Sequence, residues 1–231
     1  MRKLAVVEVK LLIREPGAIF ALLIPLFILM VFGSSIEPGD TVLLPMAVAI
    51  AVGMVGLYLL PTTLATYRER GILRRMSTTP VRPANLLAVQ VALQSVLVST
   101  TCALLIAVAG TVLDAHLPTA VGTVAVTLLL GTGAMFAVGL LIAALARNGR
   151  TANGVGVLLY FPMAYLAGLM QPAGQMPRLL ARIGEYTPLG AFRQSLHQVW
   201  ADTTPSPVLL AVLAAYAVAI SAVAAGFFRW E

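Results

Sequence analysis

Six stretches of the chain carry no charged residue and are long enough to cross a lipid bilayer as α-helices. About 20 apolar residues cover the roughly 30 Å of a bilayer's hydrocarbon core, and one charge at mid-helix costs about 2.5–3.5 kcal/mol. All 15 Lys and Arg and all 9 Asp and Glu lie outside these stretches. The sequence therefore predicts an all-α membrane protein with six transmembrane helices, over residues 17–33, 42–64, 86–113, 118–146, 152–171 and 207–228.

Composition supports a single membrane domain. Hydrophobic residues make up 60% of the chain and charged residues 10%, whereas a soluble domain carries about 25% charged residues. With 231 residues and six spans, little chain remains for a separate soluble domain. We therefore expect a single transmembrane domain over residues 1–231.

The distribution of charge predicts the orientation of the chain. A net charge of +6 could indicate binding to nucleic acid, but the positions of the basic residues favour membrane topology instead. If the N-terminus is cytoplasmic, 12 basic residues fall on the inside and only Arg178, Arg182 and Arg193 fall outside. This bias predicts a multi-pass plasma-membrane protein with both termini in the cytoplasm, and no nucleic-acid partner.

The first 15 residues have the pattern of a helix lying in the membrane interface. At 100° per residue, Lys3, Lys10 and Arg14 fall on one stripe and apolar residues lie broadly opposite. Pro16 and Gly17 then break the helix before the first span. The alternative is a cytoplasmic extension of that span.

Motifs for catalysis and for nucleotide or metal binding are missing from the sequence. Neither lysine follows a glycine, so there is no G-x-x-x-x-G-K-[ST] phosphate loop. His116 and His197 lack Cys or carboxylate companions at metal-ligand spacing. We therefore expect no catalytic residue, no metal and no cofactor in this chain, with the energy source in another polypeptide.

Two stretches of the chain resemble a known family. Residues 67–86, YRERGILRRMSTTPVRPANL, and residues 160–200, which include YTPL and FR, are similar to type-2 ABC exporter permeases. The nearest likeness is to the daunorubicin-resistance-type drug exporter subunit. The chain departs from the usual pattern at Ile72 and Ala167, where Thr and Ser are common. The matching positions in the first stretch are Glu69, Gly71, Leu73, Arg74, Thr79, Pro80 and Val81.

The resemblance implies a docking role for the cytoplasmic loop over residues 65–85. Residues 69–76 can form a short helix, with Pro80 and Pro83 preventing its continuation. By family likeness this is the coupling helix, in which Glu69, Gly71, Leu73, Arg74, Arg75, Thr79 and Pro80 contact an ABC ATPase subunit. Two copies of that subunit would bind ATP and Mg, and a second permease copy or a sister permease would complete the transporter. Alternatively, the arginines only set the orientation of the chain in the membrane and contact no partner.

The resemblance also implies an exit gate within the extracellular segment at residues 172–206. Two short helices are expected there, at residues 177–185 and 190–200. The gate residues would be Pro188, Phe192 and Arg193. The alternative is a lid on the membrane surface, with Trp200 as an interfacial anchor.

Polar and aromatic residues within the spans are candidates for the substrate path. They are Gln94 and Ser95 in the third span, with Tyr58, Phe136 and Tyr165 elsewhere. Such side chains often only bond neighbouring helices. A path without charge suits a hydrophobic or amphipathic cargo, so the sequence favours drug export, with export of a lipid-linked glycan or lipid as the alternative. The alternative outside transport is a membrane scaffold or sensor.

Overall fold

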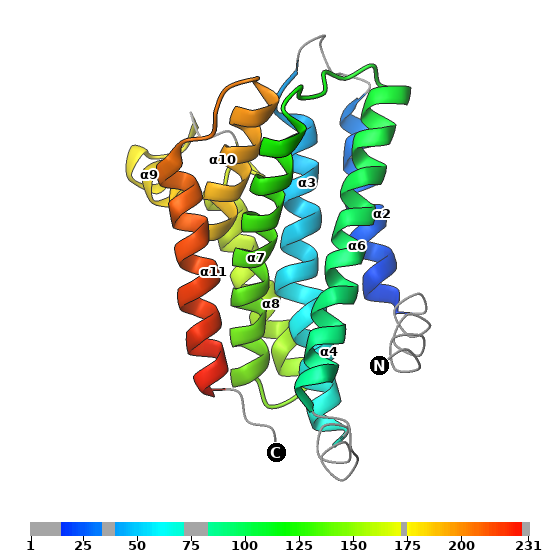
Figure 1. Ribbon diagram of the computed structural model, residues 1–231, viewed down its shortest axis with the longest axis vertical. Helices are drawn as coiled ribbons and strands as arrows, with labels where there is room; N and C mark the ends of the chain where they lie inside the picture. The colour runs from blue at the N-terminus through cyan, green and yellow to red at the C-terminus, as the bar shows by residue number, and fades with distance from the viewer. Residues whose placement is uncertain (1–14, 34–39, 72–82, 172–174, 228–231) are drawn as a thin grey trace.

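A computed structural model describes residues 15–33, 40–71, 83–171 and 175–227, and these residues form a bundle of long helices. The described part of the chain is helical and contains no strand. In chain order the elements are α2 (Pro16–Gly33), α3 (Leu43–Met54), the π-helical turn η1 (Val55–Leu59), α4 (Leu60–Glu69), α6 (Pro83–Val112), α7 (Val121–Leu145), α8 (Gly149–Leu166), α9 (Arg178–Glu185), α10 (Pro188–Trp200) and α11 (Pro207–Phe227) (Figure 1).

Five helical stretches are long and apolar enough to cross a membrane. They are α2, the continuous α3–η1–α4 segment, α6, α7 and α11. The remaining predicted span corresponds to α8, whose 18 residues include Arg150, Thr151 and Asn153 in its first two turns and are therefore less apolar. The all-α membrane class is supported, and the count of six spans stays a prediction.

Helix α8 covers Gly149–Leu166, whereas the predicted fifth span covers residues 152–171. The helix therefore begins three residues earlier and ends five residues earlier than predicted. Its start is fixed by Asn148, whose side chain accepts a 2.7 Å hydrogen bond from the N–H of Thr151. Its end is fixed by Gly168, which adopts a φ of +76°. The N–H of Leu169 then donates to the carbonyl of Ala164 at 2.9 Å, which closes a Schellman motif.

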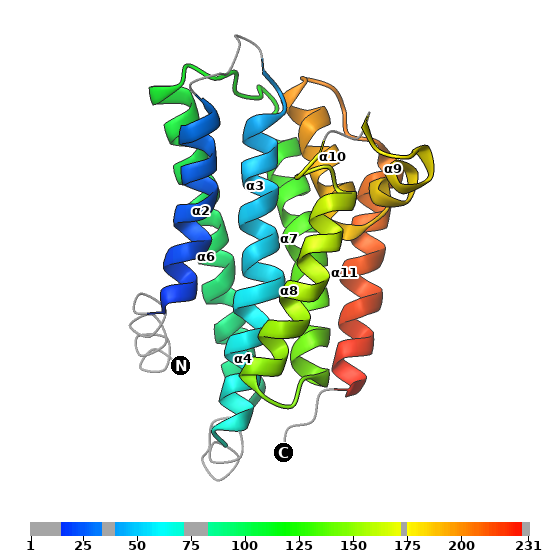
Figure 2. The ribbon, with the colours of Figure 1, turned by 180° about the vertical axis from the view of Figure 1, so that it is seen from behind.

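The helix ends gather at two opposite ends of the bundle (Figures 1 and 2). Helices α2, α6 and α8 begin at one end, where α4, α7 and α11 finish, and we call it the α4 end. The opposite end, the α10 end, carries α9 and α10. Which end faces the cytoplasm stays a prediction, and the predicted interfacial helix lies outside the described residues except for Glu15.

The second span is the centre of the bundle. In its most apolar stretch 78% of the residues are buried inside the protein, against 17% in α11, which lies along the outside of α7. Helix α10 also packs on α7, with Phe192 and Trp200 fully buried. The prediction that Trp200 is an interfacial anchor is therefore wrong, because the protein itself covers this side chain. The choice between an exit gate and a surface lid stays a prediction.

Close backbone contacts hold the π-helical turn η1 in place. The N–H of Leu60 bonds the carbonyl of Val55, so this turn is wider than an ordinary α-helical turn. A Cβ added at Gly139 of α7 would clash with the carbonyl oxygen of Gly56, and one at Gly156 of α8 with that of Leu57. Only glycine therefore lets both helices approach the backbone of η1 this closely.

This packing predicts opposite effects of alanine at two glycines of α8. Gly156→Ala places a methyl group against the Leu57 carbonyl, and such overpacking costs about 1–3 kcal/mol. Gly154→Ala, the matched control, meets open space and gains about 0.5–1 kcal/mol of helix stability. Thermal unfolding in detergent should show a lower apparent Tm for the first variant only. Equal Tm values would contradict the close contact.

Candidate functional site

The last turn of α4 contacts both sides of the connection between α7 and α8. The guanidinium of Arg68 donates through Nη1 to the carbonyl of Ala144 near the end of α7, at 3.1 Å. The next residue, Glu69, accepts a hydrogen bond at Oε2 from the N–H of Gly149, the first residue of α8, also at 3.1 Å. Two adjacent side chains therefore join three helices at the α4 end.

The charges of these two side chains match the helix ends that they contact. The C-terminal end of a helix carries partial negative charge and the N-terminal end partial positive charge, because terminal carbonyls and N–H groups lack partners within the helix. Arg68 lies at the negative end of α7, and Glu69 lies at the positive end of α8. Each such contact contributes about 0.3–1 kcal/mol at a partly exposed site.

Only two of the predicted coupling residues lie in the described part of the chain. Glu69 is the last residue of α4, and Gly71 follows in a left-handed turn with a φ of +65°. The predicted coupling helix therefore does not begin at Glu69, because α4 itself extends to this residue and the turn then ends it. The rest of that predicted helix, residues 72–76, lies outside the described residues. The other predicted residues, Leu73, Arg74, Arg75, Thr79 and Pro80, lie outside the described residues.

A large apolar cavity lies between α2, the α3–η1 segment and α8. Its volume is about 800 Å³, within the range of small-molecule sites. Among the described residues, no charged side chain lines it, and Tyr58 and Tyr160 are the lining residues that carry a hydroxyl group. The other lining residues are Phe20, Ile24, Ile28, Phe32, Leu43, Met46, Ile50, Met54, Val157, Phe161, Ala164, Leu169 and Met170.

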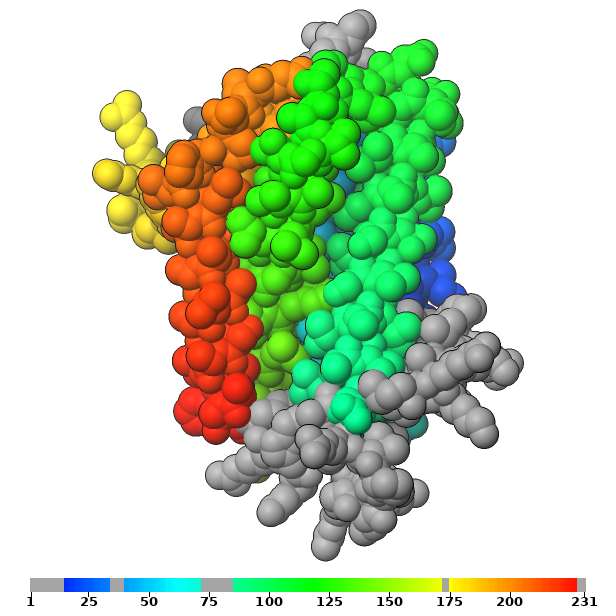
Figure 3. Space-filling view, viewed as in Figure 1, coloured from blue at the N-terminus to red at the C-terminus, as the bar shows by residue number. Residues whose placement is uncertain are grey.

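A second cavity, of about 600 Å³, runs between α6 and α7. The space-filling view shows these two helices separated along part of their length, with deeper atoms visible between them (Figure 3). Ser95 and Phe136 both line this cavity. Its wall carries more hydroxyl and thiol groups than the first cavity, from Ser99, Cys102, Thr132 and Ser221.

The five predicted substrate-path residues do not meet at one site within a single chain. Tyr58 lines the first cavity, while Ser95 and Phe136 line the second. Gln94 is fully buried and both polar atoms of its amide lack a hydrogen-bond partner. Tyr165 is half-buried and lines neither of the two cavities. Sequence position within a span did not reveal these differences, because they depend on which neighbour each helix face meets.

The predicted gate residues lie on α10, which is longer than expected. The helix begins at Pro188 instead of residue 190, because the hydroxyl of Thr187 caps the N–H of Gly190 at 3.1 Å. Pro188 is buried, and the ring of Phe192 occupies the position that a Cβ at Gly131 of α7 would take. Arg193 is half-buried, and burial lowers the pKa of its guanidinium.

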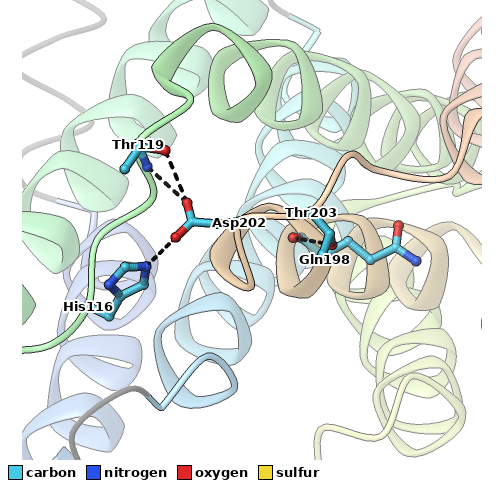
Figure 4. Close-up of polar contacts among 5 residues, drawn as sticks. All are labelled: His116, Thr119, Gln198, Asp202 and Thr203. Atoms are coloured by element: carbon cyan, nitrogen blue, oxygen red, sulfur yellow. Dashed lines mark hydrogen bonds and ion pairs between the residues drawn. The ribbon is translucent and has the colours of Figure 1, made fainter.

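An ion pair joins two connections at the α10 end (Figure 4). Nε2 of His116, between α6 and α7, lies 2.7 Å from a carboxylate oxygen of Asp202, between α10 and α11. The other oxygen of Asp202 accepts from both the N–H and the hydroxyl of Thr119. The hydrogen bond from His116 first, and those from Thr119 next, lower the pKa of Asp202. To the right of Asp202 in this view, the hydroxyl of Thr203 donates to the carbonyl of Gln198 at 2.7 Å.

Sequence reasoning missed this ion pair. It considered His116 only as a metal ligand and looked for companions at metal-ligand spacing, whereas 86 positions separate His116 from Asp202. Asp202 also adopts a left-handed φ of +50°, a conformation that Asp tolerates better than most residues. Only the fold brings the two connections together. Within the described ranges, no three His, Cys, Asp or Glu side chains gather as they would around a metal ion.

Comparison with known proteins gives one match. A family model described as ABC-2 type transporter matches residues 2–199. The match includes the whole of the α4 end contacts, the first cavity and α10 up to Val199. No curated protein and no solved structure gave a significant match to the chain.

The contacts at the α4 end predict opposite roles for two charges near the start of α8. Glu69→Ala removes the carboxylate from the helix N-terminus and should lower the free energy of unfolding by about 1 kcal/mol. Arg150→Ala, the matched control, removes an exposed cation from the same helix end and should not destabilise the protein. Denaturation of the purified chain in detergent tests both. Equal loss in the two variants would mean that the Glu69 contact adds nothing.

Proposed function

Because the chain belongs to the ABC-2 type transporter family, whose members are membrane permease subunits working with an ABC ATPase, we propose that it is the permease of an ATP-driven exporter. The chain is a multi-pass membrane protein, and ATP hydrolysis belongs to a separate subunit. The cargo that we propose is a hydrophobic or amphipathic compound of drug or antibiotic type. It would leave the cell by alternating access, through a pore built by two permease copies or by this chain and a sister permease.

The observation that carries this proposal is the extent of the family match. It covers residues 2–199 and so includes the loop between α4 and α6 as well as the region from α8 to α10. These are the two regions in which the sequence resembles drug exporter permeases. We infer that the α4 end faces the cytoplasm and that two ATPase subunits dock beside the loop after Gly71. ATP and Mg would bind to those subunits.

The contacts of α4 suggest how docking would reach the membrane. A push on the loop after Gly71 acts on the end of α4, where Arg68 and Glu69 bond α7 and α8. Hydrogen bonds with a charged partner are about twice as strong as neutral ones. Movement of α4 would therefore carry the start of α8 with it, and α8 forms one wall of the first cavity.

The first cavity suggests the class of cargo. Its wall is apolar, free of charge and about 800 Å³ in volume. Burial of apolar surface contributes about 25 cal/mol per Å², so hydrophobic or amphipathic compounds would be bound without any ion pair. A cargo carrying a large glycan would need polar partners that this wall does not offer.

The proposed docking role predicts a specific failure in the double variant Leu73→Asp/Arg74→Glu. New charges in a water-facing loop cost little, whereas the same charges in a docking groove lose desolvated contacts and repel acidic groups. The variant should insert into the membrane normally but no longer co-purify with the ATPase subunit, and transport should fall at least tenfold. Normal insertion, co-purification and export would mean that these residues serve topology alone.

The proposed cargo site predicts that filling the cavity blocks stimulation by substrates. In the purified complex with its ATPase, amphipathic compounds should stimulate ATP hydrolysis. Ile28→Trp, whose side chain lines the cavity, should abolish that stimulation while leaving basal hydrolysis intact. Leu23→Trp is the matched control, because Leu23 is on the same helix but 48% exposed and outside the cavity wall. No stimulation of the wild-type complex by any compound in the panel would favour a scaffold or sensor.

A further inference from the structure

A small cavity at the α10 end shares no lining residue with the apolar cavity or with the cavity between α6 and α7. Its volume is about 320 Å³, and three elements enclose it. The end of α8 contributes Leu166 and Ala167, while α9 contributes Arg182 and Glu185. Helix α10 contributes Gly190, Arg193 and Gln194, and the remaining lining residues are Ala181 and Gly184. This cavity has two cationic side chains in its wall and one carboxylate.

The guanidinium of Arg193 is incompletely bonded although it is largely covered by protein. Among the described residues, its hydrogen bond runs from Nη2 to the side-chain oxygen of Gln194, at 3.3 Å. Its Nε is buried and has no hydrogen-bond partner in the same part of the chain. No carboxylate in the described part of the chain forms an ion pair with Arg193 or with Arg182. A guanidinium offers five N–H donors, so most of the bonding capacity of Arg193 remains unused beside the cavity.

A partly buried cation without an anion loses hydration that no protein group replaces. Burial lowers the pKa of Arg193, which indicates that the charged form loses hydration here. The pKa of neighbouring His197 is also lowered, first by burial and then by the charge of Arg193. Positive charge is therefore disfavoured at both side chains. An oxyanion in the cavity would supply the missing acceptors, because phosphate and carboxylate groups match the planar fork of arginine.

The location of the cavity indicates where the oxyanion comes from. Helix α9 stands out from the side of the bundle beside α11, near the α10 end (Figures 1 and 3). Its Leu179 and Ile183 are 70% and 49% exposed, while Arg178 and Arg182 are exposed cations on the same helix. Such a short helix with apolar and cationic surface suits the boundary between acyl chains and headgroups.

We propose that the cavity between the end of α8, α9 and α10 binds the phosphate group of an anionic membrane lipid. Arg193 is the main ligand and Arg182 the second. Glu185, at the edge of the same cavity, opposes the anion and keeps its affinity moderate. This inference does not depend on what the chain transports, because it rests on the contacts of α9 and α10 alone.

The test uses the full-length chain, delipidated in an uncharged detergent. Three probes are titrated and followed by native mass spectrometry: inorganic phosphate, short-chain phosphatidylglycerol, and diacylglycerol with the same acyl chains. Phosphatidylglycerol should bind saturably and diacylglycerol should not. If inorganic phosphate binds with the same dependence on Arg193, the cavity is a site for a free oxyanion. Arg193 would then still bind phosphate, but phosphate from solution instead of a lipid headgroup.

Four variants decide the assignment. Arg193→Gln should weaken phosphatidylglycerol binding at least tenfold, which is about 1.4 kcal/mol. Glu185→Gln should strengthen it, and Arg178→Gln, one turn away on α9 and outside the cavity, should leave it unchanged. If Arg193→Gln fails to fold, Arg182→Gln, at an exposed position, should weaken binding several-fold. Unchanged binding in Arg193→Gln or in Arg182→Gln, or weaker binding in Glu185→Gln, would overturn the proposal.

Discussion

The packing of α7 and α8 against the bare backbone of η1 is the contact on which the bundle depends. A helix inside a membrane must satisfy its own backbone groups, because lipid offers no hydrogen-bond partners. The π-helical turn interrupts the regular pattern in the most buried span. Gly139 and Gly156 let the neighbouring helices cover this turn closely. The second span is thereby fixed between α7 and α8, and the other helices are arranged around it.

The same two helices meet α4 again at the end of the second span. There the contacts are electrostatic, from Arg68 to α7 and from Glu69 to α8. Glu69 was predicted to contact an ATPase, yet its carboxylate already bonds the N–H of Gly149 in the isolated chain. Glu69 therefore positions the start of α8, and its predicted contact with an ATPase subunit stays a prediction. The docking contacts that we propose fall on the residues after Gly71.

The fold class could be predicted from the sequence because the bilayer imposes a strong rule on charge. Helix ends were harder: α8 is fixed by the Asn148 cap and by Gly168, local signals that an apolar run obscures. The distribution of Ser95 and Gln94 over different surfaces could not be predicted, since it depends on helix rotation. The pairing of His116 with Asp202 was equally hidden, because the partners lie on connections far apart in the chain.

Helix α8 connects three features that the sequence presents separately. It starts at the Glu69 contact, its middle lines the apolar cavity through Tyr160 and Ala164, and its last residue borders the cavity of Arg193. At 1.5 Å per residue its 18 residues span about 27 Å. The close contact at Gly156 holds the first half of the helix against η1, and Pro162 interrupts the helical hydrogen bonding between that contact and the Arg193 cavity. Under the two proposals made above, a lipid phosphate bound by Arg193 and an ATPase subunit docked at the α4 end would act on opposite ends of this one helix.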